Sequence, residues 1–326
     1  SLMSCAILKA VKNWDINYVM LFKVDQNKNY DYMGITSNAT NETVGVDLAL
    51  HKGKSFDNHL SRLDELDPVN EECINLNFIK DITRKNYFKK YNLSTVLLLW
   101  GLYDLPIPES EEGKMILLTI DSSYYSHFSR YQNDREMNKF YMCDVLGLDE
   151  LYECQLRHKQ YEFKDIEKKF KLNKKITVRS KGILSTDIDL LGINLEIGLD
   201  TKVWCVLPEE PFSLHKKFRD IQVPITRRTT KISDITDNPY SVASVLFRRN
   251  YRKGEIIMLL KDENKDAIVI FSGRVARELL RRGYTIIDVK ADRTNKIKSV
   301  FVFKRENNIE DVLREFTKKD DKEIFE

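Results

Sequence analysis

The chain has 326 residues, of which 42% are apolar and 32% are charged. This length and apolar fraction suffice for one large domain or two ordinary ones, and they exclude a globally disordered chain. The 53 basic and 50 acidic residues nearly cancel, so the net charge of +3 identifies no partner by itself.

The five cysteines are scattered and form no CxxC pair, which is typical of free thiols in a reducing compartment. The longest apolar run, Val96–Leu102, is far shorter than the roughly 18 residues that a membrane-spanning helix needs. No basic segment followed by an apolar core and a cleavage site is present near residue 1. We therefore expect a cytoplasmic protein without a membrane span.

The first hundred residues mix two kinds of pattern. Tyr18–Val24 and Val44–Leu50 predict short strands, whereas Phe56–Leu66 and Phe78–Tyr91 predict helices. Asparagine-rich turns separate them. This mixture indicates the α+β fold class.

A continuous apolar run at Lys114–Ile120 opens the middle of the chain and predicts a buried strand. Asp121 and the serines after it are suited to cap a helix that follows. Two long polar helices are predicted next, at Tyr124–Leu146 and Leu148–Leu172, broken at Gly147. Further strands are predicted at Ile176–Arg179, Ile188–Ile197 and Lys202–Leu207.

Two prolines that flank two acids, Pro208 to Pro211, mark the predicted boundary between a larger α+β body (residues 1–212) and a smaller basic α+β lobe (residues 213–326). In the lobe, Asp237-Asn238-Pro239 predicts a helix that starts there and stops at Gly254. Ser272 should cap a second helix that ends at Gly283, and Tyr284–Lys290 with Ser299–Lys304 predict a hairpin.

Residues 269–316 resemble a small uncharacterised domain that occurs in phage and mobile-element proteins of low-GC Gram-positive bacteria. The matching features are Phe271-Ser272-Gly273, Ala276–Gly283 and Val300–Phe303 before a closing helix. The resemblance covers under a sixth of the chain. It implies an origin in such elements rather than an activity.

Positive charge is concentrated in the basic lobe, where residues 213–319 hold 25 basic and 14 acidic residues. Arg274, Arg277 and Arg281 fall within about 60° of one another on a helical wheel, which suits a row of phosphates. The other candidate nucleic-acid-binding residues are Arg227, Arg228, Arg248, Arg249, Arg252 and Lys253. Charge stripes are also common on solvated helix faces, so an acidic protein partner or a simple solubility role stays open.

Asp187, Asp200 and Lys202 resemble the active-site pattern of restriction-endonuclease-type nucleases, which place an aspartate on one strand and an acid-x-lysine on the next. In such sites two carboxylates, here Asp187 and Asp200, hold a divalent cation such as Mg²⁺, and the lysine orients or activates the attacking water. The acid-x-lysine pattern recurs elsewhere in the chain, so surface carboxylates are the competing interpretation.

Two further patterns involve metal chemistry. Asp187 and Asp189 resemble the metal-binding pair of minimal nucleotidyltransferases, although Arg179-Ser180 stands where that family has Gly-Ser. Cys154 and His158 are four residues apart, so one helix could direct both at a zinc ion, with Cys143 nearby in sequence. A core thiol beside a surface imidazole is the simpler interpretation of that pair.

These patterns together predict a nucleic-acid-binding protein of a phage, plasmid or defence system, and a magnesium-dependent nuclease is the enzyme class that they favour. A non-enzymatic module that binds an acidic partner and a nucleotidyltransferase-like enzyme are the alternatives.

Overall fold

The computed structural model describes residues 1–21, 31–39, 43–224, 231–234, 239–246, 254–261, 267–270, 272–291, 299–306, 308–309 and 311–313. The chain divides into two compact units, residues 1–261 and 262–326. Both contain helices and strands, so the predicted α+β class is confirmed. Within the described ranges, no helix combines the length and the apolar character needed to cross a bilayer.

The division falls beyond the boundary predicted at residue 212. Strand β8 (Ser213–Pro224) starts just after that point and pairs with β2 (Asp31–Ile35). Its other neighbour, β10 (Gly254–Lys261), pairs in turn with β9 (Ser241–Leu246). With β1 (Tyr18–Leu21), these strands form an antiparallel five-stranded sheet in the order β1-β2-β8-β10-β9.

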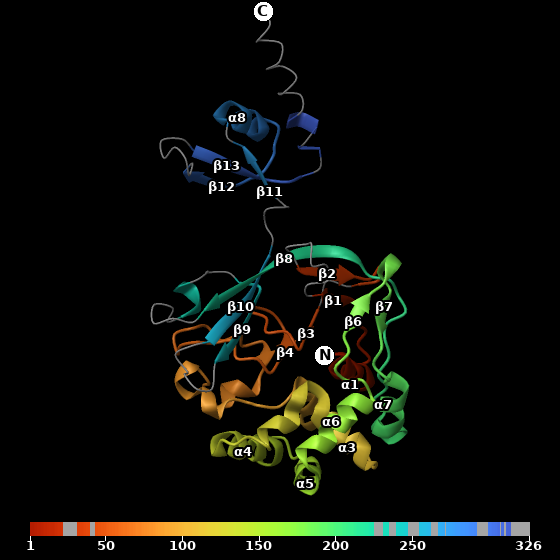
Figure 1. Cartoon of the computed structure of the whole chain (residues 1–326). Helices are drawn as coiled ribbons and strands as arrows, with labels where there is room; N and C mark the ends of the chain where they lie inside the picture. Colours follow the sequence, from red (N-terminus) through yellow and green to blue (C-terminus); the bar gives the residue numbers. More distant parts are fainter. Residues whose placement is uncertain are drawn as a thin grey trace, which may run out of the picture. The chain divides into compact units, whose positions relative to one another are not determined.

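The labelled helices of the first unit lie below this five-stranded sheet in the view of Figure 1. This unit holds the α-helices α1 (Leu2–Lys12), α2 (Thr95–Leu102), α3 (Glu111–Thr119), α4 (Gln132–Lys139), α5 (Asp149–Arg157), α6 (Gln160–Lys169) and α7 (Leu190–Ile197). Shorter 3₁₀ segments are η1 (Leu76–Lys80), η2 (Arg84–Lys89), η3 (Ile120–Ser126), η5 (Ser180–Gly182), η6 (Leu199–Thr201) and η7 (Ile232–Asp234), and η4 (Phe140–Val145) is a π-helical turn.

Two smaller sheets complete the first unit. Strands β3 (Gly45–Val46), β4 (Ser55–Phe56) and β5 (Cys73–Ile74) pair in parallel. Strands β6 (Ile176–Val178) and β7 (Leu184–Thr186) form a hairpin. Helices α2 and α3 form the centre of the main apolar core, in which the side chains of Leu97, Trp100 and Leu117 are fully buried.

The strand predicted at Lys114–Ile120 is wrong, because this run lies in helix α3. Ser110 caps the helix by accepting a hydrogen bond from Gly113 N at 2.8 Å. Met115 to Leu118 are all buried, since α5, α6 and α7 pack around α3. A helix that is buried on all sides shows no 3.6-residue periodicity, so its sequence is indistinguishable from that of a buried strand.

Three other predictions of local structure differ from the fold. Ile188–Ile197 is mainly helix α7 rather than a strand, because Asp189 caps it by accepting a hydrogen bond from Gly192 N. The described part of the helix predicted from Asp237 to Gly254 is strand β9, whose backbone groups pair with β10. Phe56–Leu66 is helical nowhere, and Phe78–Tyr91 holds only 3₁₀ turns.

The second unit agrees more closely with the sequence patterns. Helix α8 (Gly273–Arg281) starts at Ser272, whose Oγ accepts a hydrogen bond from Val275 N. Strand β13 (Ser299–Lys304) pairs with both β11 (Ala267–Ile270) and β12 (Ile286–Ala291). Ala276 and Leu279 of α8 are buried in the core of this unit.

Candidate metal centre

Three short parallel strands end at the same edge of their sheet. Asp47 follows β3, Asp57 follows β4 and Asn75 follows β5 directly in the chain. The ladder continues past the strands, because Asp47 N donates to Phe56 O at 2.8 Å and Asp57 N donates to Ile74 O at 3.1 Å. Carboxyl ends of parallel strands are where α/β sheets commonly bind ligands.

Asp57 and His59 form the centre of this edge. The Asp57 carboxylate is fully buried, and its Oδ1 accepts a hydrogen bond from His59 Nδ1 at 2.7 Å. Its Oδ2 accepts from the backbone N of His59 at 3.0 Å and from Asn75 Nδ2 at 3.4 Å. The buried charge therefore has three donors, which fix the orientation of both its oxygens.

Asp47 completes a group whose ligand atoms all lie within 4.8 Å of one another: one carboxylate oxygen each from Asp47 and Asp57, and a ring nitrogen of His59. Thr95, the first residue of α2, donates its hydroxyl to Asp47 Oδ1 at 3.1 Å. The backbone nitrogen of Ser1 lies 3.1 Å from Asp47 Oδ2.

Asp121 brings a third carboxylate to the same region from the end of α3. Its Oδ2 accepts a hydrogen bond from Asn58 Nδ2 at 3.1 Å, and Asn58 also donates to Leu93 O. The sequence predicted a helix-capping role for Asp121, but it makes no cap and lies inside η3 with a φ of 54°.

Backbone strain accompanies two of these carboxylates. Asp47 has a φ of 58°, and Asp121 and Ser122 have φ values of 54° and 55°. The left-handed region costs a non-glycine residue about 1–2 kcal/mol. Such conformations persist where the surrounding structure holds them in place, and they are common at functional sites.

Electrostatic interactions couple the four side chains. Desolvation alone lowers the pKa of His59, but the hydrogen bond and charge of Asp57, together with the charges of Asp47 and Asp121, outweigh it and raise the pKa to about 9. Desolvation, followed by the charge of Asp47, raises the pKa of Asp121 above its ordinary value. Converging carboxylates of this kind are stabilised by a shared cation.

The donor set fits a divalent metal ion. Carboxylate oxygens suit Mg²⁺ and Mn²⁺, and an imidazole nitrogen shifts the preference toward transition metals such as Mn²⁺. Asp47, Asp57 and His59 could bind the ion directly, and the charge of Asp121 interacts with His59 and Asp47. His59 is 44% exposed, so a ligand from solvent has access.

The residues predicted for the nuclease pattern have different surroundings. Asp187 is exposed and lies between β7 and α7, while Asp200 and Lys202 are exposed in and directly after η6. The strand predicted at Lys202–Leu207 is absent, since Asn194 of α7 exchanges two hydrogen bonds with the backbone of Cys205 and holds this segment in an irregular conformation.

Asp189 caps α7, so the Asp187–Asp189 pair is not on the strand that a nucleotidyltransferase would need. Within the described part of the chain, two groups of at least three His, Cys, Asp or Glu side chains are close enough to share an ion, and neither includes Asp187 or Asp200.

The predicted arginine face is described in part. Arg274, Arg277 and Arg281 of α8 are all exposed, and Arg281 forms an ion pair with Glu278 at 3.6 Å. Arg227, Arg228, Arg248, Arg249, Arg252 and Lys253 lie outside the described residues.

Residues 265–325 are similar to a domain of unknown function, DUF5659. This confirms that the resemblance noted for residues 269–316 concerns an uncharacterised domain. Comparison with curated proteins gives no match, and comparison with solved structures gives none either. The candidate metal centre lies outside the matched residues and depends on its geometry alone.

The sequence patterns did not single out Asp47, Asp57 or His59. Their strands are two residues long, which is too short for any alternation to be visible. The available signal was that an aspartate directly follows an apolar residue at both Val46 and Phe56, with a histidine two residues after the second aspartate.

Proposed function

We propose that this protein is a divalent-metal-dependent phosphoesterase that acts on nucleic acid, with the metal held by Asp47, Asp57 and His59 beside Asp121. The observation that supports the proposal is the convergence of these side chains, whose ligand atoms lie within 4.8 Å of one another at the ends of β3 and β4. A metal-dependent nuclease is also the enzyme class that the sequence favours, but the ligands proposed here differ from Asp187 and Asp200.

The chemistry of the donor set supports a phosphoester substrate. Mg²⁺ and Mn²⁺ on a few carboxylates keep open coordination positions that water and phosphate oxygens fill. A bound ion of this kind polarises the phosphoryl oxygen and lowers the pKa of a metal-bound water, which makes it a nucleophile near neutral pH.

Charge on helix α8, rather than on the second unit as a whole, supports a polyanionic substrate, because residues 262–326 hold 15 basic and 14 acidic residues. Arg274, Arg277 and Arg281 are exposed on α8, in a region of the chain with 25 basic and 14 acidic residues between 213 and 319. Guanidinium groups bind phosphate with paired hydrogen bonds. The resemblance of residues 269–316 to a phage and mobile-element domain supports a role in a phage, plasmid or defence system.

The decisive experiment measures hydrolysis by the full chain with Mn²⁺, Mg²⁺ or EDTA. Suitable substrates are end-labelled single-stranded RNA and DNA, duplex DNA and bis(p-nitrophenyl) phosphate. We expect metal-dependent cleavage that Asp57→Asn reduces at least about 100-fold, since loss of a direct ligand should exceed the effect of losing an outer partner. His59→Gln, at a half-exposed position, tests the same site with less risk to folding.

The double variant Asp187→Asn/Asp200→Asn is the matched control, because it removes the two carboxylates of the alternative site. It should retain activity within about twofold of wild type. Loss of activity in this control with retention in Asp57→Asn and His59→Gln would transfer the site to Asp187 and Asp200. Absence of hydrolysis on every substrate, combined with nucleic-acid binding, would leave a non-enzymatic binding protein.

A further inference from the structure

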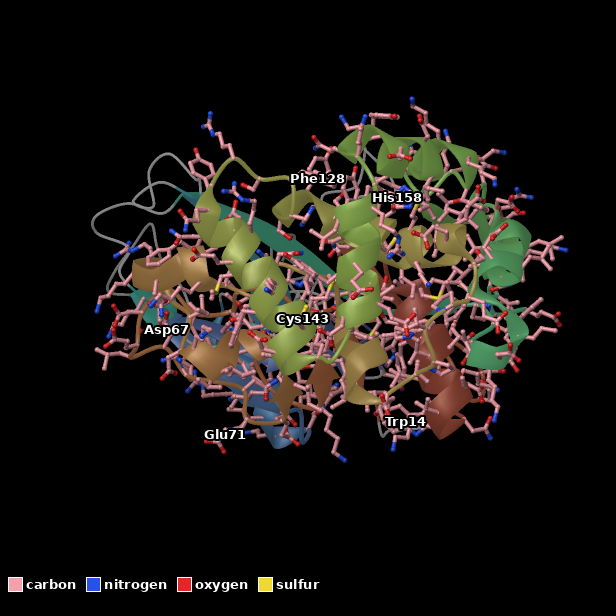
Figure 2. The ribbon with its side chains drawn as sticks, turned by 90° about the horizontal axis from the view of Figure 1, so that it is seen from below. Trp14, Asp67, Glu71, Phe128, Cys143 and His158 are labelled. Atoms are coloured by element: carbon pink, nitrogen blue, oxygen red, sulfur yellow. The ribbon has the colours of Figure 1, made fainter. Side chains whose placement is uncertain are left out.

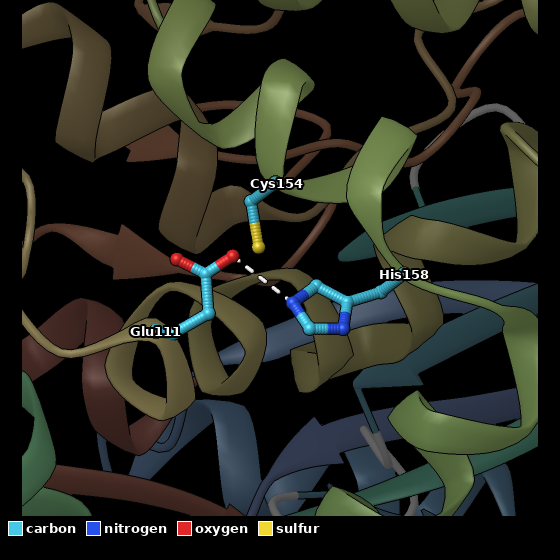
Figure 3. A group of neighbouring side chains, drawn as sticks. All are labelled: Glu111, Cys154 and His158. Carbon is cyan, nitrogen blue, oxygen red and sulfur yellow. Dashed lines mark hydrogen bonds and ion pairs between the residues drawn. The ribbon is translucent and has the colours of Figure 1, made fainter.

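A second group of potential metal ligands lies at the junction of α3 and α5. Glu111 is the first residue of α3, Cys154 is a fully buried residue of α5, and His158 directly follows α5 (Figure 3). Their ligand atoms all lie within 4.8 Å of one another, and His158 Nε2 is 3.0 Å from Glu111 Oε1. A tetrahedral zinc ion holds neighbouring ligand atoms roughly 3.3–3.8 Å apart, so small side-chain rotations suffice.

The second ring nitrogen of His158 has its own carboxylate partner. His158 Nδ1 lies 3.1 Å from Glu162 Oε1, and the other Glu162 oxygen accepts from Lys159 N at 2.7 Å, which fixes this carboxylate at the start of α6. Zinc-bound histidines typically donate their remaining N–H to such a carboxylate, which orients the ring and strengthens the other nitrogen as a ligand. Glu162 thus directs Nε2 toward Glu111 and Cys154.

Arg157 orients the third side chain. It donates to Glu111 Oε1 from Nε and Nη2 at 3.0 and 2.8 Å, and from Nη2 to Oε2 at 3.0 Å. Each carboxylate oxygen has two lone pairs, so one on Oε1 or Oε2 stays available for a metal while the guanidinium remains bound. Arg157 also offsets the negative charge that Glu111 and Glu162 bring to the site.

A nucleophilic role for Cys154 is disfavoured by its surroundings. The Cys154 side chain is fully buried, so its thiol has no contact with solvent. Reactive cysteines need solvent access, which Cys154 lacks. The cluster therefore has the residue types of a catalytic Cys–His pair but not the access to the thiol that a nucleophile requires.

We propose that Glu111, Cys154 and His158 bind a zinc ion that joins the start of α3 to the end of α5 and keeps a fourth position open to solvent. Thiolate, imidazole and carboxylate are the three ligand types that Zn²⁺ takes in proteins, and mixed sets of three with an open position are known for this ion. Cys154 binds as the thiolate and releases its proton to solvent when the ion enters.

This site is separate from the candidate centre at Asp57. Helix α3 starts at Glu111 and ends just before Asp121, so its length of about 13 Å lies between the two clusters. The ligand sets also differ, since a sulfur ligand is present here and absent among Asp47, Asp57 and His59. A signal specific for metal–sulfur bonding therefore reports on this site even where both are occupied.

The test titrates the EDTA-treated full chain with Co²⁺, a spectroscopic substitute for zinc, and then displaces it with Zn²⁺. We expect the near-ultraviolet charge-transfer band of a thiolate–cobalt bond, which Zn²⁺ abolishes. Cys154→Ser should remove the band, and His158→Gln, at a more exposed position, should weaken binding at least about tenfold. Zn²⁺ should raise the Tm of wild type, and the rise should be smaller in both variants.

Cys143→Ser is the matched control. Cys143 lies in η4 and is separated from His158 in the view from below (Figure 2). It is not part of the group formed by Glu111, Cys154 and His158, so its replacement should leave the band, the affinity and the Tm shift unchanged. Absence of the band in wild type, its persistence in Cys154→Ser or its loss in Cys143→Ser would each overturn the proposal. The cobalt titration does not measure phosphoesterase activity. A negative result for the zinc site can therefore be told apart from a negative result for the proposed phosphoesterase site at Asp57.

Discussion

Asp57 and His59 are joined by a hydrogen bond of 2.7 Å between Oδ1 and Nδ1, although one side chain is fully buried and the other is 44% exposed. The pair thus connects the interior of the first unit to its surface. The buried carboxylate fixes the imidazole ring, and the exposed face of that ring can contact a ligand from solvent. The hydrogen bond therefore holds two of the three candidate ligands next to each other in the metal-free chain.

His59 in the metal-free chain should titrate well above an ordinary histidine. Its folded pKa of about 9 exceeds the reference value of 6.5. Because the folded chain binds this proton more tightly than the unfolded chain, the stabilisation is complete below pH 6.5 and is lost as pH rises through about 9. NMR titration of the ring protons in EDTA should report this pKa, and Asp57→Asn should lower it.

His215 is the internal control for that titration. Desolvation and then the charge of Lys216 lower its pKa, so its ring should titrate below 6.5 in the same spectra. A His59 resonance that titrates near 6.5 in wild type would contradict the described charge arrangement around it.

Asn77 should be a strong contributor to the stability of the candidate centre. Its Nδ2 donates to Asn58 O at 3.1 Å, and its Oδ1 accepts from Tyr91 N at 2.8 Å. Asn77→Ala would leave that buried N–H unpaired, so we expect a loss of about 2–3 kcal/mol in urea unfolding. The exposed helical Asn133→Ala should change stability by less than about 0.5 kcal/mol. Equal effects of the two variants would contradict the role assigned to Asn77.

Local signals explain which parts of the fold could be predicted. Helix α8 begins at a serine cap and ends before Gly283, which has a φ of 85°, and both features are visible in sequence. Helix α3 was predicted as a strand because its apolar run is buried on all sides, so the decisive information was the packing of α5, α6 and α7 around it.

The candidate site depends on relationships between distant residues. Asp47, Asp57 and Asn75 become neighbours through the register of three two-residue strands, and Asp121 joins them from the end of another element. None of these residues has a motif around it. In contrast, the spacing of Cys154 and His158 is visible in the sequence. The third candidate ligand, Glu111, lies on another helix, so its proximity is not visible there.

Gly113→Ala should destabilise α3 and weaken zinc binding together. A Cβ at this position would lie 2.2 Å from the backbone oxygen of Glu196 in α7, so α3 must move. Overpacking of this kind costs about 1–3 kcal/mol, and Glu111 is only two residues away. Gly53→Ala is the control: it strains a loop with a φ of 93° but meets no atom within 4 Å, so it should leave Zn²⁺ affinity unchanged. Thermal unfolding and the cobalt titration measure both effects.

The arginine face of α8 should determine the salt dependence of nucleic-acid binding. Arg274, Arg277 and Arg281 are exposed on one helix, and each phosphate contact contributes about 0.9 to the slope of log affinity against log salt on duplex DNA. Replacing all three with Gln should therefore reduce the magnitude of that slope by about 2–3, with little change in the thermal stability of the chain. Fluorescence anisotropy across a range of salt concentrations measures the slope.

A control that removes the same charge elsewhere separates specific contacts from bulk attraction. Lys164, Lys171 and Lys174 are exposed residues of the first unit, in and after α6. Changing these three lysines to Gln removes the same net charge as the triple arginine variant. It should leave the slope of log affinity against log salt within about 1 of wild type, because salt limits the reach of surface charges to about 10 Å. An equal effect of both triple variants would mean that α8 makes no particular contact. No binding to RNA or DNA even at low salt would favour an acidic protein partner for this helix, because guanidinium groups bind carboxylates with the same paired geometry.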